Sequence, residues 1–268
     1  MRLVVKVGSS TLLTREGILD VDAMAALASQ IGRLASEEHE VVLVSSGAVG
    51  SGQGYTGASH WNRAALAAVG QPYLMSLYQE MLSPRLVAQL LVLQADLSGP
   101  GAAHLKDTLS ALLSHGVVPV VNENDATSHG GAGVGENDTV AGFVAMALDA
   151  DLLVLLGDVD GVYDRHPSLP GSTFVPALDP SGARTLASRT DGGAHEAGRF
   201  GRGGMASKLH AAARLAESGI TTVIAEGRRP EVLMDIVGGR PAGTRVMPVV
   251  ATMGSQAEDC RGYCQFPA

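Results

Sequence analysis

Short apolar runs alternate along the chain with longer segments in which apolar residues recur every three or four positions. A short run that is apolar almost throughout is typical of a strand buried on both faces of a parallel sheet, whereas the longer spacing is that of an amphipathic helix. The expected strands are 2–7, 41–44, 88–93, 117–121, 152–156, 173–175, 221–225 and 244–247, and the expected helices are 22–37, 62–69, 74–82, 102–115, 139–148, 205–218 and 230–237. This order predicts an α/β protein, a three-layer α/β/α sandwich with a mainly parallel central sheet.

Small and polar residues follow four of the expected strands, in the segments 8–10, 45–50, 122–125 and 157–161. Open α/β sheets bind ligands beyond the carboxyl ends of their strands, so we expect these segments to form one site. The chain shows no internal repeat and no long linker. A less distinct boundary between two parts of the chain falls near Gly157, where the sequence becomes rich in Gly, Asp and Pro.

The composition excludes several classes of protein. Hydrophobic residues make up 46% and charged residues 17%, which is incompatible with an intrinsically disordered chain. The net charge of −8 argues against nucleic acid and anionic membranes as partners. No signal-peptide pattern opens the chain and no apolar stretch is long enough to cross a membrane, so we expect a cytoplasmic protein. Cys260 and Cys264 form neither a disulfide framework nor a zinc site, and no metal-binding set of side chains is predicted.

Lysine is rare, with three lysines against sixteen arginines. Lys6 precedes Gly8 at the end of the first expected strand, and Lys208 follows a glycine-rich stretch at the start of a helix. Glycine turns and helix N-termini present backbone N–H groups that bind phosphate, and an ammonium group adds a compact positive charge. Lys106 lies in an ordinary amphipathic helix and is expected at the surface. The stretch 201–206 fits the letters of G-x-G-x-x-A but follows no strand, and no P-loop motif is present, so neither a dinucleotide fingerprint nor an ordinary P-loop is indicated.

Five short motifs carry a family resemblance. In chain order they are KVGSS at 6–10, SSGA at 45–48, VPVVNEND at 118–125, GEND at 135–138 and GGMASK at 203–208. Their order is similar to that of the amino-acid kinase superfamily, and the Asn-Glu-Asn-Asp stretch with the late Gly-Gly-Met-x-x-Lys most resembles the glutamate 5-kinases. The resemblance spans residues 1–248 and implies the fold of that superfamily.

The resemblance implies ATP-dependent phosphorylation of the L-glutamate side-chain carboxylate to L-glutamyl 5-phosphate, the first step of proline biosynthesis, with ATP and Mg²⁺. Such a carboxylate is ionised at pH 7 and needs no general base, so catalysis depends on positioning and on cations. By resemblance, Lys6 and Lys208 are the catalytic cations. Asp138 organises the two lysines and could also cap its helix. Mg²⁺ would be held largely by the phosphates and water.

The other site residues are also implied by the resemblance. Asp125 suits the α-ammonium group of glutamate, and backbone amides after Ser46 suit a carboxylate. Gly157 and Arg202 are departures, because relatives often carry Thr at both positions. The residues expected to bind glutamate are Ser46, Gly47, Asn122, Asp125 and Asn137. The residues expected to bind ATP are Lys6, Gly8, Gly157, Asp158, Arg202, Gly203, Gly204, Met205 and Lys208.

The resemblance divides the matched region into a glutamate-binding part, roughly 1–156, and a nucleotide-binding part, roughly 157–248, followed by the tail 249–268. Many bacterial relatives append a PUA-type domain, for which too few residues remain here, so a form lacking it is expected. The implied partners are L-glutamate, ATP, further copies of the chain in a homodimer or higher homo-oligomer, and the reductase that uses glutamyl phosphate. The expected dimer surface lies on the helices around 62–82 and includes Trp61, Tyr73, Leu74, Leu77 and Tyr78.

Two other functions stay open. Another acyl-phosphate kinase of the same fold would act on N-acetylglutamate or carbamate. N-acetylglutamate has no α-ammonium group, so a pocket carboxylate such as Asp125 would be a liability there. The second alternative is a non-catalytic amino-acid sensor, but a sensor has no use for Lys6 and Lys208 together with Asp138.

Overall fold

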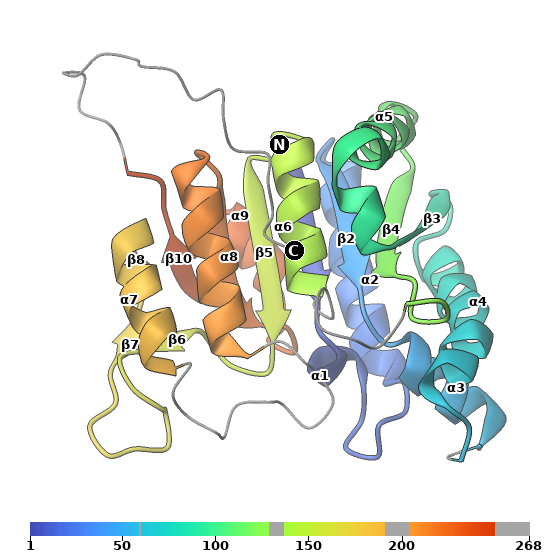
Figure 1. The fold of residues 1–268 in the computed structure, drawn as a ribbon, viewed down its shortest axis with the longest axis horizontal. Coiled ribbons are helices and arrows are strands. Elements are labelled where there is room, and N and C mark those ends of the chain that lie inside the picture. The colour runs from blue at the N-terminus through green and yellow to red at the C-terminus, as the bar shows by residue number, and fades with distance from the viewer. Residues whose placement is uncertain (59, 129–136, 191–203, 250–268) are drawn as a thin grey trace.

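The computed structural model describes residues 1–58, 60–128, 137–190 and 204–249 (Figure 1). Its strands are β1 (Arg2–Val7), β2 (Glu40–Ser45), β3 (Val87–Val92), β4 (Val118–Glu123), β5 (Leu152–Gly157), β6 (Val162–Tyr163), β7 (Phe174–Val175), β8 (Ala177–Leu178), β9 (Thr221–Glu226) and β10 (Thr244–Val246). Its helices are α1 (Ser9–Leu12), α2 (Val21–Ser36), α3 (Ala48–Thr56), α4 (Arg63–Met81), α5 (Gly99–Ser114), α6 (Asn137–Ala147), α7 (Pro180–Thr190), α8 (Met205–Glu217) and α9 (Val232–Val237), with a 3₁₀ helix, η1, at Gln94–Leu97.

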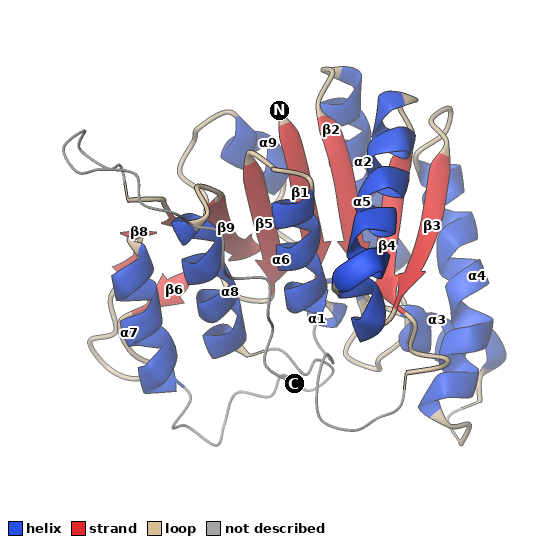
Figure 2. Ribbon diagram, turned by 45° about the horizontal axis from the view of Figure 1, so that its top comes forward, coloured by secondary structure: helices blue, strands red, loops and turns tan. Residues whose placement is uncertain are grey.

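One sheet of eight strands has the order β3-β4-β2-β1-β5-β9-β10-β8. The pairs from β3 to β9 are parallel, while β10 runs antiparallel to β9. Helices α5, α6, α7 and α8 cover one face of the sheet, and α2, α4 and α9 cover the other (Figure 2). The predicted three-layer sandwich with a mainly parallel sheet is therefore confirmed. No helix in the described part of the chain is long and apolar enough to cross a membrane.

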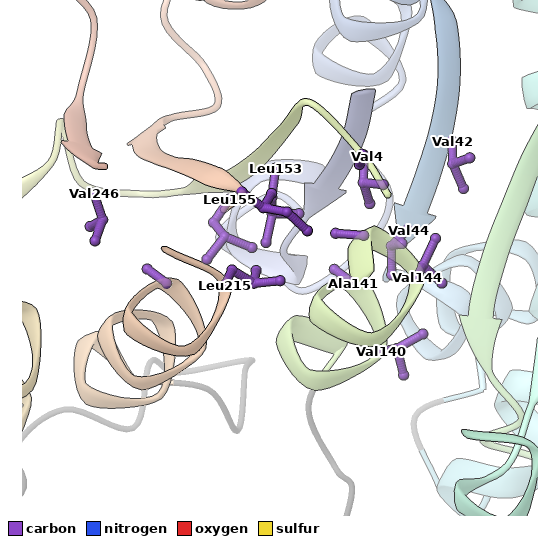
Figure 3. Packing of buried hydrophobic residues seen from close by; sticks show 14 of the residues in the cluster. Val4, Val42, Val44, Val140, Ala141, Val144, Leu153, Leu155, Leu215 and Val246 are labelled. Atoms are coloured by element: carbon purple, nitrogen blue, oxygen red, sulfur yellow. The ribbon is translucent and has the colours of Figure 1, made fainter. Parts of the chain in front are cut away.

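The central strands carry apolar side chains on both faces and are buried on both. Figure 3 shows Val4, Val44 and Leu155 on the face that packs against Val144 of α6 and Leu215 of α8. A second apolar cluster lies between the opposite face and α2, α4 and α9. Full burial of an aliphatic side chain stabilises the fold by about 1.5–3 kcal/mol. These contacts fix α6 and α8 on the sheet, with the first turn of each helix at the carboxyl edge of the strands.

Helix α4 corrects the expectation of two helices at 62–69 and 74–82. A single helix runs through Pro72, which lies on its exposed side. The buried side packs closely on α3: a Cβ atom at Gly70 would lie 1.9 Å from the carbonyl oxygen of Ala48. The helix continues past the proline because tertiary packing on α3 and on the sheet outweighs the local preference.

Helices α3 and α7 were not expected. Glycine has a low helix propensity, and α3 contains Gly50, Gly52 and Gly54. The same glycines let α4 approach, since a Cβ atom at Gly52 would lie 2.0 Å from the carbonyl oxygen of Leu66. Helix α7 starts at Pro180, a residue type that suits the first turn of a helix but also marks loops.

Two of the five residues expected at the dimer surface do not lie at the surface, so the prediction is wrong for them. Leu74 and Tyr78 are fully buried in the core between α4 and the sheet. They recur with the helical period on the apolar stripe of α4, and that stripe faces the protein interior. Trp61 precedes the helix and is exposed, and Tyr73 and Leu77 are half-buried.

Candidate active site

The carboxyl ends of β1, β2, β4 and β5 lie at one edge of the sheet, where Figure 1 shows the arrowhead of β5 close to α1. Helices α1, α3 and α8 begin at this edge directly after glycines, namely Gly8, Gly47 and Gly204, and α6 begins at Asn137. Each helix start offers backbone N–H groups that have no partner within the helix. The edge is therefore suited to bind anions.

Three charged side chains meet at this edge and are named here the lysine–aspartate cluster: Lys6, Asp138 and Lys208. The ammonium nitrogen of Lys6 lies 2.6 Å from Oδ1 of Asp138, and that of Lys208 lies 3.2 Å from Oδ2. The three residues are 6%, 1% and 9% exposed. Strand β1, helix α6 and helix α8 each supply one member, so the sheet and the helices on one of its faces together determine the geometry.

Asp138 is ionised in this arrangement. Burial by itself would raise the pKa of Asp138, but the ammonium groups of Lys6 and Lys208 outweigh burial and hold the pKa below its usual value. A carboxylate that stays negative cannot serve as a proton donor near neutral pH. Its role in the structure is to hold two positive charges side by side.

Three amide side chains form a second group, named here the amide network: Gln71, Asn122 and Asn137. Nδ2 of Asn137 shares its two hydrogens among three acceptors within hydrogen-bond distance: the carbonyl oxygen of Ser45 at 2.9 Å, Oγ of Ser46 at 3.0 Å and Oδ1 of Asn122 at 2.9 Å. Nδ2 of Asn122 donates in turn to Oε1 of Gln71 at 3.0 Å. The network joins β2, β4, α4 and α6 beside the lysine–aspartate cluster.

Glycines adjoin both groups, and the absence of their side chains leaves space beside the functional side chains. Gly47 has φ +104°, a conformation that L side chains rarely adopt, and it turns the chain from Ser46 into α3. A Cβ atom at Gly8 would lie 3.5 Å from Nζ of Lys6. A Cβ atom at Gly157 would lie 3.7 Å from Cε of Lys208. Side chains at positions 8 and 157 would therefore narrow the space beside the two lysines.

The structure brings together six of the residues singled out in the sequence: Lys6, Asp138 and Lys208, and Ser46, Asn122 and Asn137. Asp125 lies half-buried in the turn after β4, and Asp158 lies exposed after β5. Met205 opens α8 and packs against the core. Arg202 and Gly203 lie outside the described residues, as do both cysteines and most of the tail 249–268.

One detail of the motif 122–125 differs from the expectation of a polar loop. Strand β4 continues through Asn122 and Glu123, which pair with Leu91 and Val92 of β3. The strand continues because the backbone ladder satisfies the N–H and C=O groups of these polar residues. Asn122 is consequently held by the sheet, whereas Asp125 lies in a turn.

Sequence reasoning missed Gln71 and Thr11. Gln71 occupies the buried stripe of α4 between Ala67 and Leu74, where an apolar residue is the norm. A glutamine at that helical position was the available signal. Thr11 is buried and donates from Oγ1 to the carbonyl oxygen of Gly157 at 3.2 Å, and no pattern in the sequence marked it.

Lys106 was expected at the surface, and the structure confirms this. Its side chain is half-exposed and lies 3.7 Å from the exposed carboxylate of Asp149. Among the residues that the structure describes, no group of three or more His, Cys, Asp and Glu side chains could hold a metal ion.

Two ammonium groups held by one carboxylate at a glycine-rich sheet edge suit the stabilisation of a transferring phosphoryl group, which spreads its charge over three oxygens. This defines a class of protein, the phosphotransferases on a three-layer α/β/α fold. Solved structures share the fold. Carbamate kinase from Giardia lamblia bound to AMP-PNP has a TM-score of 0.66 at 19% identity, covering 92% of this chain and 98% of that chain. UMP kinase from Bacillus anthracis has a TM-score of 0.62 at 14% identity, covering 92% and 95%.

The model of the amino acid kinase family matches residues 1–226. The glutamate 5-kinase of Clostridium acetobutylicum is 38% identical over 256 residues, covering 92% of this chain and 94% of the relative. That of Symbiobacterium thermophilum is 42% identical, covering 91% and 94%, and that of Thermus thermophilus is 42% identical, covering 91% and 66%. The chain belongs to the amino acid kinase family and, within it, to the glutamate 5-kinases, which confirms the resemblance carried by the five motifs.

Proposed function

We propose that this chain transfers the γ-phosphoryl group of ATP to the side-chain carboxylate of L-glutamate, giving L-glutamyl 5-phosphate and ADP in the first step of proline biosynthesis. A carboxylate oxygen of glutamate forms the new bond to phosphorus, and the bond from phosphorus to the bridging oxygen of ADP breaks. No proton is transferred, because the carboxylate is already ionised at pH 7. The observation that carries the proposal is the buried pair of lysines fixed by Asp138 beside the amide network.

Lys6 and Lys208 are the catalytic cations in this proposal. Each ammonium group would contact oxygens of the phosphates, where negative charge moves during transfer, and Asp138 would keep both groups in place and charged. Mg²⁺ would arrive with ATP and neutralise charge on its phosphates. It would be held largely by the phosphates and by water.

Glutamate would lie between the lysines and the amide network. Ser46 and Gly47, with the backbone N–H groups at the start of α3, would bind one of its carboxylates. Asn122 and Asn137 would orient it, and the carboxylate of Asp125 would pair with its α-ammonium group. The half-buried position of Asp125 after β4 supports this assignment, since a partly desolvated carboxylate pairs more strongly with a cation.

The nucleotide would lie on the side of β5 and α8. Gly8, Gly157, Gly204, Met205 and Lys208 would surround the phosphates, with Asp158 toward the rest of the nucleotide. Arg202 and Gly203 belong to the same assignment. In this proposal, residues 1–156 supply most of the glutamate site and residues 157–248 most of the nucleotide site.

The proposed assembly is a homodimer or a higher homo-oligomer. Large apolar side chains are exposed around α3, α4 and the edge strand β3, namely Tyr55, Trp61, Leu86, Leu91 and Leu93. An exposed edge strand with apolar neighbours favours association. The product is an acyl phosphate, so the reductase that uses it is the proposed functional partner.

ADP release with different acceptors tests the proposed function. L-glutamate, N-acetylglutamate, carbamate and L-aspartate are supplied in turn with ATP and Mg²⁺ at equal concentration. We expect release with L-glutamate to exceed that with every other acceptor. Faster release with N-acetylglutamate or carbamate would support another acyl-phosphate kinase. Glutamate binding without ADP release from any acceptor would support a sensor.

A further inference from the structure

Gln71 has an unusual position for a polar residue. It lies on the apolar stripe of α4 and is 6% exposed. Its Oε1 accepts a hydrogen bond from Nδ2 of Asn122, while its buried Nε2 has no hydrogen-bond partner among the residues that the structure describes. An unpaired buried amide N–H group lowers stability, so an apolar side chain such as Met would suit a purely structural role better. The hydrogen bond to Asn122 is what glutamine contributes here.

Two backbone groups determine how the amides of the network are oriented. The N–H of Glu123 can only donate, and it donates to Oδ1 of Asn137 at 3.3 Å. The carbonyl oxygen of Ser45 can only accept, and it accepts from Nδ2 of Asn137. The atom of Asn122 that faces this Nδ2 must therefore be Oδ1, which directs Nδ2 of Asn122 toward Gln71.

Gln71 is the last acceptor in this series of hydrogen bonds, which runs from Asn137 through Asn122 to Gln71. With a side chain that cannot accept, Nδ2 of Asn122 would be left without its acceptor. If the Asn122 amide turned over to escape this, its Nδ2 would face Nδ2 of Asn137, donor against donor. Asn137 would then move, and with it Oγ of Ser46, to which it donates at 3.0 Å. The effect would reach the proposed glutamate site.

We propose that Gln71 is a positioning residue for the acceptor substrate. Its Oε1 sets the orientation of the Asn122 amide, and through Asn137 it holds the hydroxyl of Ser46 where glutamate binds. This inference rests on the proposed function. Because the series reaches Ser46 and includes no member of the lysine–aspartate cluster, Gln71 governs affinity for glutamate and leaves the phosphoryl-transfer step unchanged.

Steady-state kinetics of three variants test the proposal. Gln71→Met keeps the approximate length and removes the acceptor, and we expect the KM for L-glutamate to rise at least about tenfold, while kcat and the KM for ATP stay within about threefold. Gln71→Glu keeps an acceptor oxygen toward Asn122, and we expect a KM for L-glutamate within about threefold of the wild-type value. Gln71→Asn withdraws the acceptor by one methylene group and should resemble Gln71→Met, which keeps the test decisive if the Met variant does not fold.

Gln30 provides a matched control. It is also buried, on α2, and its Oε1 accepts from the backbone N–H of Leu233 in α9 at 2.9 Å, so its partner belongs to neither the amide network nor the lysine–aspartate cluster. Gln30→Met should lower the thermal unfolding temperature and leave the KM for L-glutamate unchanged. The proposal is overturned if Gln71→Met has a wild-type KM for L-glutamate, or if its kcat falls by as large a factor as its KM for L-glutamate rises. It is also overturned if Gln71→Glu has the same raised KM for L-glutamate as Gln71→Met. Failure of the wild-type protein to phosphorylate glutamate would instead overturn the proposed function.

Discussion

The two groups that meet at the first turn of α6 hold their atoms in different ways. Asp138 joins the lysine–aspartate cluster through ion pairs at the ends of two long side chains. Its neighbour Asn137 joins the amide network through hydrogen bonds to short side chains and to the backbone. An ion pair tolerates changes of angle, whereas an amide must present the correct atom to each partner.

This difference matches two separate requirements of phosphoryl transfer to glutamate. Negative charge moves over several phosphoryl oxygens during the transfer. Closely placed cations stabilise this charge without requiring each oxygen to lie at one fixed position. Selection of one acceptor instead requires donors and acceptors at fixed positions. We therefore expect changes in the lysine–aspartate cluster to lower kcat, and changes in the amide network and Asp125 to raise the KM for glutamate.

The largest effect is expected for Lys208→Ala. Loss of its charge beside the transferring phosphoryl group should lower kcat by about a hundredfold or more. Stopped assays of ADP formation at saturating substrates measure this. A variant that keeps more than about a tenth of the wild-type kcat, a loss below about 1.4 kcal/mol, would remove Lys208 from the catalytic machinery.

Lys106→Ala is the control for this prediction. Lys106 has the same chemistry, but its side chain is half-exposed on α5 beside Asp149. Exposed ion pairs contribute about 0–1 kcal/mol to stability. Both kcat and the thermal unfolding temperature of this variant should match the wild-type protein.

Asp138→Asn should have the next largest effect. Asparagine keeps the size of the side chain but removes the negative charge that holds Lys6 and Lys208 together, so kcat should fall about tenfold to a hundredfold. The KM for L-glutamate should change much less, because Asn137 and Asn122 keep their partners. An unchanged kcat would show that the lysines do not depend on the carboxylate.

Asp125→Asn should affect the binding of glutamate and leave the phosphoryl-transfer step unchanged. Loss of the carboxylate leaves the α-ammonium group of glutamate without its partner, and the KM for L-glutamate should rise at least about tenfold, on the order of 1.4 kcal/mol. The KM for ATP should stay the same. The preference for L-glutamate over glutarate, which lacks the ammonium group, should become smaller. Were both KM values and this preference to stay at wild-type levels, Asp125 would be a turn residue only.

The smallest effect concerns acid stability. Burial would raise the pKa of Asp138, but Lys6 and Lys208 lower it below the usual 3.8, and hydrogen bonds from Arg240 and Arg229 lower the pKa of Asp235. Groups with a lowered pKa in the folded state contribute stability above the unfolded value, and this contribution is lost as pH falls through the folded value. The thermal unfolding temperature should therefore lose this contribution below about pH 4. A less steep acid decline is expected in Asp138→Asn, and an identical decline would contradict the assignment.

Local patterns in the sequence predict part of this molecule well. Strands β1 and β5 are apolar on both faces and were expected within a residue of their observed bounds. Lys6 and Lys208 stand out in glycine-rich segments at a strand end and a helix start, and parallel topology brings such segments to one edge. Asp138 was singled out only by the family resemblance. Helix α3 and the unbroken α4 were not predictable from local preference. Glycine and proline disfavour helices, and the close contact between the two helices, together with the packing of α4 on the sheet, compensates.

The amide network shows the same limit at the level of single residues. Asn122 and Asn137 stand in recognisable motifs, but Gln71 is 51 positions from Asn122 along the chain. Nothing in its local sequence indicates a hydrogen bond to β4. Its contribution depends on the packing of α4 on the sheet, which the hydrophobic pattern alone does not specify.

Calorimetric titration of L-glutamate into Lys208→Ala and Asn137→Ala tests the division between the two groups most directly, with thermal unfolding to verify that both variants are folded. We predict that Lys208→Ala binds L-glutamate within about threefold of the wild-type Kd although its kcat is lower by about a hundredfold or more. We predict that Asn137→Ala weakens binding at least about tenfold, on the order of 1.4 kcal/mol. Equal losses of affinity in the two variants, or wild-type affinity in Asn137→Ala, would contradict the account.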